Sequence, residues 1–222
     1  MFSLEAMIRI AMTKMPVFLD GAGITLQLAA WTVILGSFFG ILVALMRLSK
    51  IRPIRWISTA YVEFLRGTPL LVQVLIVYFG LPQLGIKMPR MTAGIVALTI
   101  NSAAYMSEIV RSGIQAVDHG QTEAARSLGM TSVQTMLYVI LPQAIKNILP
   151  AVGNEFVVII KESSILYTIG IYELTYQANK LASTNYRYLE TLMISALIYF
   201  VLTFVTSQLL GVLERRMRRG DR

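Results

Sequence analysis

The chain has 222 residues, of which 55% are hydrophobic and 14% charged, with a mean hydropathy of +0.64; soluble domains carry about a quarter charged residues, so this composition indicates an integral membrane protein. The net charge of +8 comes from basic residues at the ends of apolar segments rather than along one stripe, which disfavours a nucleic-acid partner. The absence of cysteine excludes a disulfide framework, and a single histidine, His119, disfavours a metal site.

Five apolar segments are long enough for membrane-spanning helices, which need about 20 mostly apolar residues. Four of these segments contain long charge-free stretches, whereas the fourth in chain order carries Glu155, Lys161 and Glu162. The predicted fold class is therefore an all-α integral membrane protein with about five transmembrane helices. The predicted spans are 21–46, 57–84, 91–113, 146–172 and 190–213.

The segments outside the spans complete the predicted domain organisation. Residues 1–20 are expected to form an N-terminal membrane-surface segment, because charged residues such as Glu5 and Lys14 interrupt any core of a cleavable signal peptide. Residues 21–216 form one predicted transmembrane domain, without an internal repeat or a low-complexity linker. Residues 217–222 form a predicted basic cytoplasmic tail.

Basic residues also predict the orientation of the chain. The connection 47–55 and the C-terminal tail are both strongly basic, and basic connections stay on the cytoplasmic side of a membrane. Both can do so only if 146–172 crosses the bilayer. The N-terminus is then outside, the C-terminus is cytoplasmic, and residues 112–146 lie on the cytoplasmic side as well.

A short, half-polar helix is predicted within that cytoplasmic connection, at about 120–130. Its residues fall into an apolar side, two charged residues on other faces, and a glycine suited to end the helix. The apolar side consists of Ala124, Ala125 and Leu128. The charged residues are Glu123 and Arg126, and the glycine is Gly129. Such a helix can dock in a hydrophobic groove of a partner, or it can be an ordinary amphipathic surface helix.

Polar residues inside the spans are candidates for substrate contacts, because polar groups are costly at that depth. In the third span, Asn101 and Tyr105 share one helical face and Ser102 adjoins them. In the fourth span, the run Lys161-Glu162-Ser163-Ser164 falls near the bilayer centre, which favours a helix break whose second half offers its N-terminus to a carboxylate. The alternatives are a polar clasp between helices at Asn101 and a neutralising network around Glu155, Lys161 and Glu162.

Two acid–base pairs lie at the cytoplasmic ends of spans. Glu63 and Arg66, and likewise Glu108 and Arg111, are three residues apart on a helix and can face each other. We interpret both pairs as gating or structural pairs. Between them, Gly67-Thr-Pro69 predicts a kink.

Four segments in this order resemble a known family. Glu123-Ala-Ala-Arg-Ser-Leu-Gly129, followed by Ile140-Leu-Pro142, resembles the EAA loop of ABC importer permeases. The others are Glu63-Phe-Leu-Arg-Gly-Thr-Pro-Leu-Leu-Val-Gln73, Tyr105-Met-Ser-Glu-Ile-Val-Arg-Ser-Gly-Ile-Gln115, and Gly153-Asn-Glu-Phe156 leading to Lys161-Glu-Ser-Ser164. Together they resemble permeases of the polar amino acid uptake type over about residues 17–220. His119-Gly120 departs from the family, which often has a proline there.

The resemblance implies a type I ABC importer permease fold in which 120–130 is a coupling helix on cytoplasmic ABC ATPase subunits. It further implies a second permease copy or paralogue, an extracellular or periplasmic solute-binding protein, surrounding membrane lipid, and alternating access across a bacterial cell membrane. No GxxxxGK[ST] segment is present, so ATP and Mg are expected on the partner ATPase. The chain itself is expected to be no enzyme and to hold no cofactor.

The expected ligand is a polar amino acid. Glu155 and Glu162 favour a basic one, and Lys161 beside them weakens that inference. The main alternative function is an ion-coupled secondary amino acid transporter, in which the two glutamates would couple the ion; the missing inverted repeat argues against it.

Overall fold

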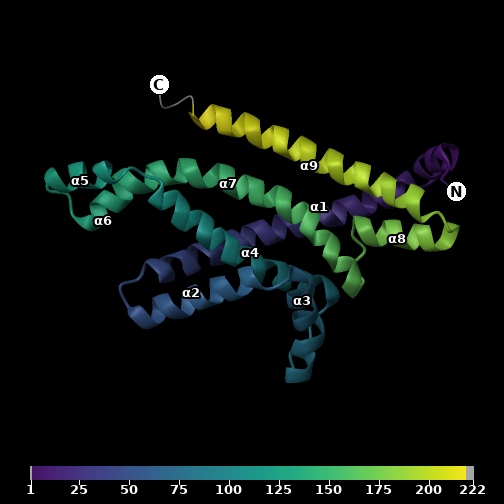
Figure 1. Cartoon of the computed structure of the whole chain (residues 1–222), viewed down its shortest axis with the longest axis horizontal. Coiled ribbons are helices and arrows are strands. Elements are labelled where there is room, and N and C mark those ends of the chain that lie inside the picture. The colour runs from purple at the N-terminus through teal and green to yellow at the C-terminus, as the bar shows by residue number, and fades with distance from the viewer. Residues whose placement is uncertain (1, 219–222) are drawn as a thin grey trace.

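The structure, a computed structural model, describes residues 2–218, and within that range it is helical with no strand. Its long helices lie side by side as an elongated bundle (Figure 1). They are α1, Leu4–Leu48; α4, Arg90–Gln115; α7, Leu141–Glu162; and α9, Tyr188–Arg218. Residues 219–222 of the predicted basic tail lie outside the described range.

Shorter elements join the long helices. The α-helical ones are α2, Arg52–Gly67; α3, Leu70–Leu75; α5, His119–Ser127; α6, Ser132–Thr135; and α8, Leu174–Asn185. The π-helical turns are Ile76–Gly80 and Met136–Ile140, and the 3₁₀ segments are Leu81–Leu84 and Ser163–Ile169.

The two ends of the bundle are distinct. The α1–α2 turn lies at the same end as α5 and α6, whereas the N-terminus and α8 lie at the other end (Figure 1). The arrangement places the basic connection 47–55 and the predicted coupling segment on one side, as the distribution of basic residues requires.

The described helices include four that are long and apolar enough to cross a membrane, and a bent pair can supply a fifth span. The predicted span 57–84 is broken at the place where Gly67-Thr-Pro69 predicted a kink, and α2 and the segment Leu70–Leu84 meet there at 108°. Thr68 is extended there, with φ −118° and ψ 147°. The cause is Pro69, which disfavours the helical conformation of the residue before it.

Two further predicted boundaries differ in the structure. Residues 1–20 do not form a separate element, because α1 runs without interruption from Leu4, past Pro16, through the predicted span 21–46. The predicted span 146–172 is α-helical only up to Glu162 and continues as a 3₁₀ segment. Where residues 1–20 lie relative to a membrane stays a prediction.

Close packing of α1 on α4 forms the centre of the bundle. A Cβ added at Gly36 would lie 2.6 Å from Ser102 Oγ, and one added at Gly40 would lie 2.4 Å from Met106 Cβ. Glycine is therefore required at both positions, as is common where membrane helices approach closely.

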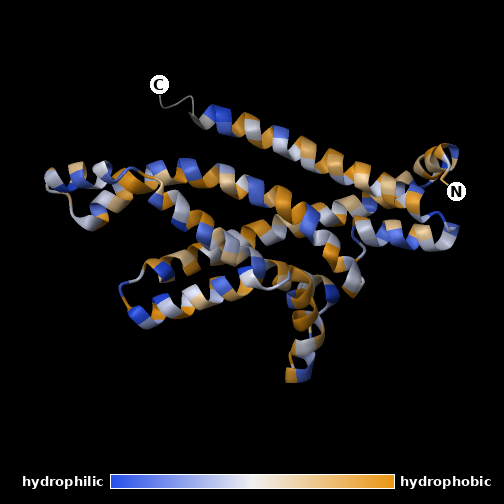
Figure 2. Cartoon of the chain, viewed as in Figure 1, coloured by the Kyte–Doolittle hydropathy of each residue, from blue (hydrophilic) through white to orange (hydrophobic). Residues whose placement is uncertain are grey.

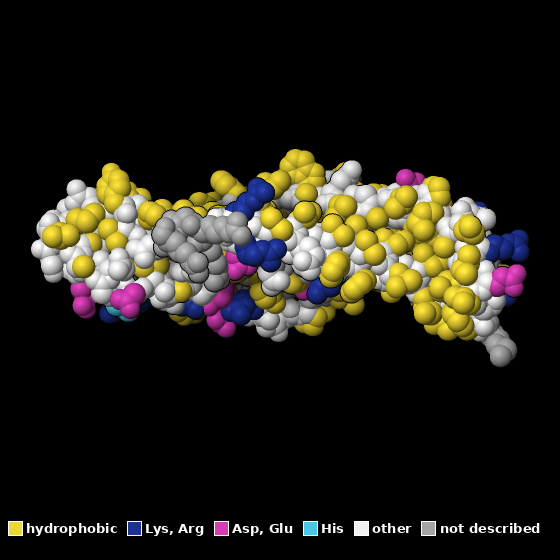
Figure 3. All heavy atoms as spheres, turned by 90° about the horizontal axis from the view of Figure 1, so that it is seen from above, with side chains coloured by type: hydrophobic (Ala, Val, Ile, Leu, Met, Phe, Trp, Pro, Cys, Tyr) yellow, Lys and Arg dark blue, Asp and Glu magenta, His cyan; other side chains and the backbone are white. Residues whose placement is uncertain are grey.

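The outer surface of the bundle is apolar. Phe200, Phe204 and Leu209 on α9 are exposed by more than half, and hydrophobic residues dominate much of α9 and the segment after α2 (Figure 2). Seen from the α9 side, hydrophobic side chains cover much of the surface, while charged side chains gather toward the ends and near the C-terminus (Figure 3). An apolar belt between charged ends is the surface of a membrane-embedded protein.

Candidate functional site

The predicted coupling helix is α5, and both of its ends are fixed by local hydrogen bonds. Asp118 caps its N-terminus, because Gly120 N donates to Asp118 Oδ1 at 2.7 Å. Gly129 follows the helix with φ +83°, the left-handed conformation that glycine adopts at low cost. The neighbouring Met130 N donates to Ala125 O at 3.2 Å, which closes the last turn.

The apolar residues of α5 do not all face the same way. Ala125 is buried against the chain itself, whereas Ala124 is exposed and Leu128 is 84% exposed. Glu123 and Arg126 are exposed, as expected for solvated residues. The sequence pattern predicted that the three apolar residues share one side that could face a partner. In the structure Ala125 instead packs against the turns that follow α5.

Exposed apolar residues that follow α5 extend its outer surface. Val133 is 67% exposed, Leu137 50% and Tyr138 72%. We call Leu128, Val133, Leu137 and Tyr138 the coupling patch. Exposed apolar residues of this kind, in a segment that also exposes the charged residues Glu123 and Arg126, are typical of a protein–protein contact.

The coupling patch is attached firmly to the bundle. Thr131 and Gln134 form a reciprocal capping box at the start of α6, with Gln134 N donating to Thr131 Oγ1 at 3.3 Å and Thr131 N donating to Gln134 Oε1 at 2.8 Å. Gln143 on α7 donates to Gln121 Oε1 on α5 at 3.3 Å. This hydrogen bond links α5 directly to α7.

Asn101, predicted as a substrate contact or as a clasp between helices, forms such a clasp in the structure. Its Nδ2 donates to Gln73 Oε1 at 2.9 Å, and both residues are buried. Gln73 Nε2 in turn donates to the carbonyl oxygens of Leu65 at 2.8 Å and Thr68 at 3.1 Å. These carbonyls lie at the break between α2 and α3, so Gln73 satisfies backbone groups there. Gln73 was missed as a functional residue, although a glutamine four residues after Pro69 in an apolar run was a usable signal.

Ser102 and Glu155 do come together. Glu155 on α7 is 9% exposed and faces Ser102 on α4, which is 2% exposed. Glu162 lies two turns after Glu155 on the same face of α7, and it is half-buried. Ser102 and Glu155 are thus buried between α4 and α7, and Glu162 adds a second carboxyl group on the same face of α7.

The other residues of the polar run at the end of α7 differ in their exposure. Lys161 is exposed, Ser164 is half-buried, and Ser163 is buried with its hydroxyl donated to Ile160 O at 2.9 Å. Of the four residues, Ser163 alone has its side-chain polar group bonded to the backbone, whereas Lys161, Glu162 and Ser164 are at least partly exposed.

The predicted half-helix N-terminus for a substrate carboxylate is not present after this run. The chain leaves α7 as a 3₁₀ segment and restarts as α8 only at Leu174. The first amides of α8 are already occupied, since Glu173 accepts from Thr175 N at 2.8 Å and Tyr176 N at 2.7 Å. The protein supplies its own carboxylate to that helix end, and this prediction is therefore wrong.

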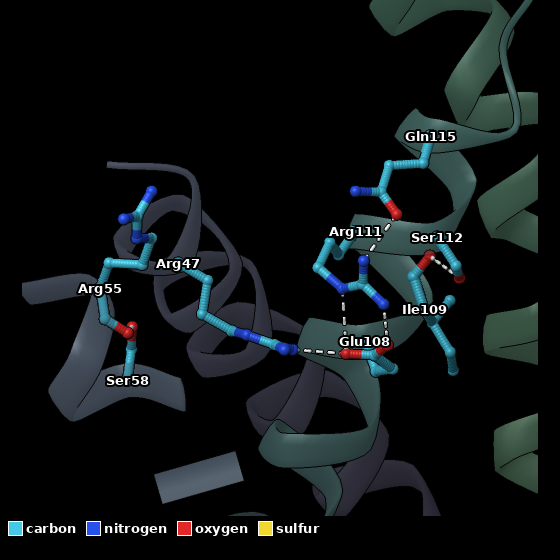
Figure 4. Close-up of polar contacts among 8 residues, drawn as sticks. All are labelled: Arg47, Arg55, Ser58, Glu108, Ile109, Arg111, Ser112 and Gln115. Carbon is cyan, nitrogen blue, oxygen red and sulfur yellow. Dashed lines mark hydrogen bonds and ion pairs between the residues drawn. The ribbon is translucent and has the colours of Figure 1, made fainter. Parts of the chain in front are cut away.

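Glu108 and Arg111 form the predicted ion pair, and a third residue joins them (Figure 4). Arg111 Nε donates to Glu108 Oε2 at 3.2 Å, and Arg47 at the end of α1 also forms an ion pair with Glu108. Glu108 thus joins the ends of α1 and α4. Arg47 was assigned from the sequence only to a basic connection, because no local spacing relates it to residue 108.

The second predicted pair is different. None of the ion pairs among the described residues joins Glu63 to Arg66. The guanidinium of Arg66 lies over the ring of Tyr105, 5.5 Å from its centroid, and Glu63 is exposed. Tyr105 therefore holds the end of α2 by a cation–π contact.

Comparison with known proteins identifies the family. A family model described as "Binding-protein-dependent transport system inner membrane component" matches residues 36–219. The chain belongs to this family. The permease is 43% identical over 209 residues to the arginine transport system permease protein ArtQ of Bacillus subtilis, covering 94% of this chain and 95% of that one. It is 44% identical to the probable glutamine ABC transporter permease protein GlnM of the same organism, covering 91% and 94%.

Solved structures agree with this assignment. The permease matches the crystal structure of an amino acid ABC transporter with histidines, at a TM-score of 0.91 and 51% identity, over 97% of this chain and 99% of that one. An inward-facing structure of the MetNI methionine ABC transporter shares the fold, at a TM-score of 0.69 and 18% identity, over 90% and 97%. The predicted type I ABC importer permease fold is confirmed, and the comparisons give no support to an ion-coupled secondary transporter.

Proposed function

We propose that this permease carries a polar amino acid into the cell and is driven by cytoplasmic ABC ATPase subunits that dock on the coupling patch. The observation that carries the proposal is the exposure of Leu128, at 84%, on a helix whose ends are both fixed. A large aliphatic side chain held in solvent by a rigid hairpin is suited to fill a groove on a partner. ATP and Mg would then act on the partner, and this chain would be a translocation subunit rather than an enzyme.

We place the ligand between α4 and α7, next to Ser102, Glu155 and Glu162. Two carboxylates in an apolar bundle are costly unless a positive group or a hydrogen-bond donor accompanies them. The amino group of an amino acid supplies one, and the side chain of a basic amino acid supplies a second. The names of the relatives, which include an arginine and a glutamine system, and the histidines of the solved relative support an amino acid ligand.

The remaining partners follow from the family and from the shape of the chain. A second permease copy, identical or related, would complete the path, and an extracellular or periplasmic solute-binding protein would deliver the ligand. The N-terminus would be outside and the C-terminus cytoplasmic, in a bacterial cell membrane. The basic connection 47–55 lies at the end of the bundle that carries the coupling patch, which supports this orientation (Figure 1).

The test is transport by the reconstituted complex. The permease is co-purified with its ATPase, placed in proteoliposomes and given a liganded binding protein, and the uptake of labelled arginine, histidine and glutamine is measured. We expect uptake only with ATP and with the ATPase present. Uptake driven by a proton or sodium gradient without ATP would refute the proposal.

The orientation of the chain can be tested with a single engineered thiol, because the chain contains no cysteine of its own. Ser127→Cys places one thiol on α5. In intact cells it should resist a membrane-impermeant maleimide and react only after the cells are opened. Labelling in intact cells would place α5 outside and overturn the ATPase contact.

A further inference from the structure

An apolar groove opens between α1, α2 and α4, and its lining includes none of Ser102, Glu155 and Glu162. Its volume is about 390 Å³, and its walls include Phe39 and Val43 of α1, Tyr61 of α2 and Ala103 of α4. Phe39 is 46% exposed, so the groove is open to the surroundings of the bundle. In a membrane-embedded protein such a surface faces acyl chains.

One end of the groove lies beneath the α1–α2 turn. Val43 is one helical turn before Arg47, and Tyr61 is six residues after Arg55, or about 9 Å along α2 at 1.5 Å per residue. On α1 the groove extends from Val43 back to Leu35, which is about 12 Å along the helix. The groove thus extends along α1 and ends about one helical turn before Arg47, close to the α1–α2 turn.

The turn carries basic residues that are available to a ligand. Lys50, Arg52 and Arg55 are exposed, and none of them takes part in an ion pair within residues 2–218, the part of the chain that the structure describes. The nearby acid, Glu108, is already engaged by Arg47 and Arg111 (Figure 4). The α1–α2 turn therefore carries positive charge that no ion pair among the described residues compensates.

We infer that the groove and the turn together bind one anionic phospholipid. The acyl chain lies along Val43, Phe39 and Leu35, and the phosphate meets Lys50, Arg52 and Arg55. Basic residues at the end of a membrane helix each favour anionic lipid by about 1 kcal/mol, and burial of the acyl chain in the groove adds site specificity. The leaflet that supplies the lipid depends on the proposed orientation, whereas the binding itself does not depend on the proposed ligand or ATPase.

The first test measures lipid retention. The detergent-extracted permease–ATPase complex is titrated with phosphatidylglycerol or phosphatidylcholine of identical acyl chains and examined by native mass spectrometry. We expect phosphatidylglycerol to be retained at least about fivefold more strongly, the preference that one such charge gives. Lys50→Gln, Arg52→Gln and Arg55→Gln together should reduce the preference to near one. The matched control, Arg215→Gln, removes an exposed charge from α9 and should preserve it.

The second test distinguishes a bound phospholipid from free phosphate and from a second permease copy in the groove. Phe39→Trp, with Trp31 and Trp56 replaced by Phe, should be quenched more by brominated phosphatidylglycerol than by brominated phosphatidylcholine, and 10 mM inorganic phosphate should not reverse the quenching. Equal retention of the two lipids by the parent, or an unchanged preference in the triple variant, would overturn the inference. Displacement of the lipid by free phosphate would also overturn the inference. An efficient disulfide between two Val43→Cys copies would do so as well, because it would place the groove at a permease–permease contact. Elution volume and thermal stability verify that each variant is folded.

Discussion

Asn101 on α4 donates a hydrogen bond to Gln73 at 2.9 Å, and Gln73 in turn binds the backbone carbonyls left at the break between α2 and α3. The pair thereby fixes a bend of 108° against the centre of the bundle. Asn101, one of the predicted ligand contacts, therefore also supports the bend between α2 and α3. The same bend, once fixed, determines where the apolar segment Leu70–Leu84 projects from the bundle.

Removal of the hydrogen bond between Asn101 and Gln73 should lower the stability of the protein rather than its affinity for the ligand. Asn101→Leu leaves Gln73 Oε1 buried without a donor, which costs about 1–3 kcal/mol. We expect a lower midpoint of thermal unfolding for the purified complex and an unchanged KM for uptake in the fraction that remains folded. Asn154→Leu, at an exposed position on α7, is the matched control. A raised KM at full stability would restore Asn101 to the ligand site.

Gly129 allows a second prediction with an unusually close control. Gly129 and Gly85 have nearly equal φ values, +83° and +86°, and an added Cβ would meet nothing within 4 Å at either position. Gly129→Asp and Gly85→Asp therefore carry the same backbone cost. We expect Gly129→Asp to lower ATP-driven uptake by an order of magnitude or more while the complex still folds, because it alters the coupling patch. Gly85→Asp, at the far end of the segment after α2, should retain uptake.

Glu108 should contribute measurably to stability at the junction of α1 and α4. Glu108→Gln leaves Arg47 and Arg111 without their shared carboxylate, and hydrogen bonds to charged groups are worth about 1.5–3 kcal/mol. Glu63→Gln, at an exposed acid on α2, should change stability by less than about 0.5 kcal/mol. Thermal unfolding of the two variants side by side decides the matter: equal midpoints would show that the Glu108 cluster does not hold the helices together.

The two carboxylates on α7 should determine which amino acids are carried. Glu162→Gln, and separately Glu155→Gln, should raise KM for arginine at least tenfold more than KM for glutamine, because only the cationic side chain loses a charge partner. Lys161→Gln, on the exposed side of the same turn, is the control. Uniform effects on both substrates would mean that the carboxylates serve assembly rather than selection.

Glu173 predicts a pH dependence of stability. Burial raises the pKa of Glu173 to about 7 from an ordinary 4.5, while hydrogen bonds from Thr175, Tyr199 and Tyr176 oppose part of this rise. Between pH 4.5 and 7 the folded state therefore holds a proton on Glu173 that the unfolded chain releases, so the contribution of Glu173 to stability is greatest below pH 4.5 and declines as pH rises toward 7, by at most about 3 kcal/mol. Glu173→Gln keeps a hydrogen-bond acceptor but cannot ionise. Melting curves between pH 5 and 8 should slope downward for the parent and lie flatter for the variant; parallel curves would contradict the assignment.

The sequence alone determined the features that depend on composition and local order along the chain. Long apolar stretches specify helices whatever they pack against, because unpaired backbone groups are too costly in a bilayer. Local rules also located the short helix before Gly129, the break at Gly67-Thr-Pro69 and the pairing of Glu108 with Arg111, because each depends on residues no more than a few positions apart.

Only the tertiary structure decided how the polar residues are used. Asn101 meets Gln73, Arg66 meets Tyr105, and Arg47 meets Glu108 across separations that no helical periodicity encodes. Buried polar groups bind whichever partner the packing brings within reach, and here Gly36 and Gly40 set that packing by allowing α1 to approach α4. A ligand contact, a clasp and a cation–π pair are therefore indistinguishable in the linear chain, and the fold assigns them.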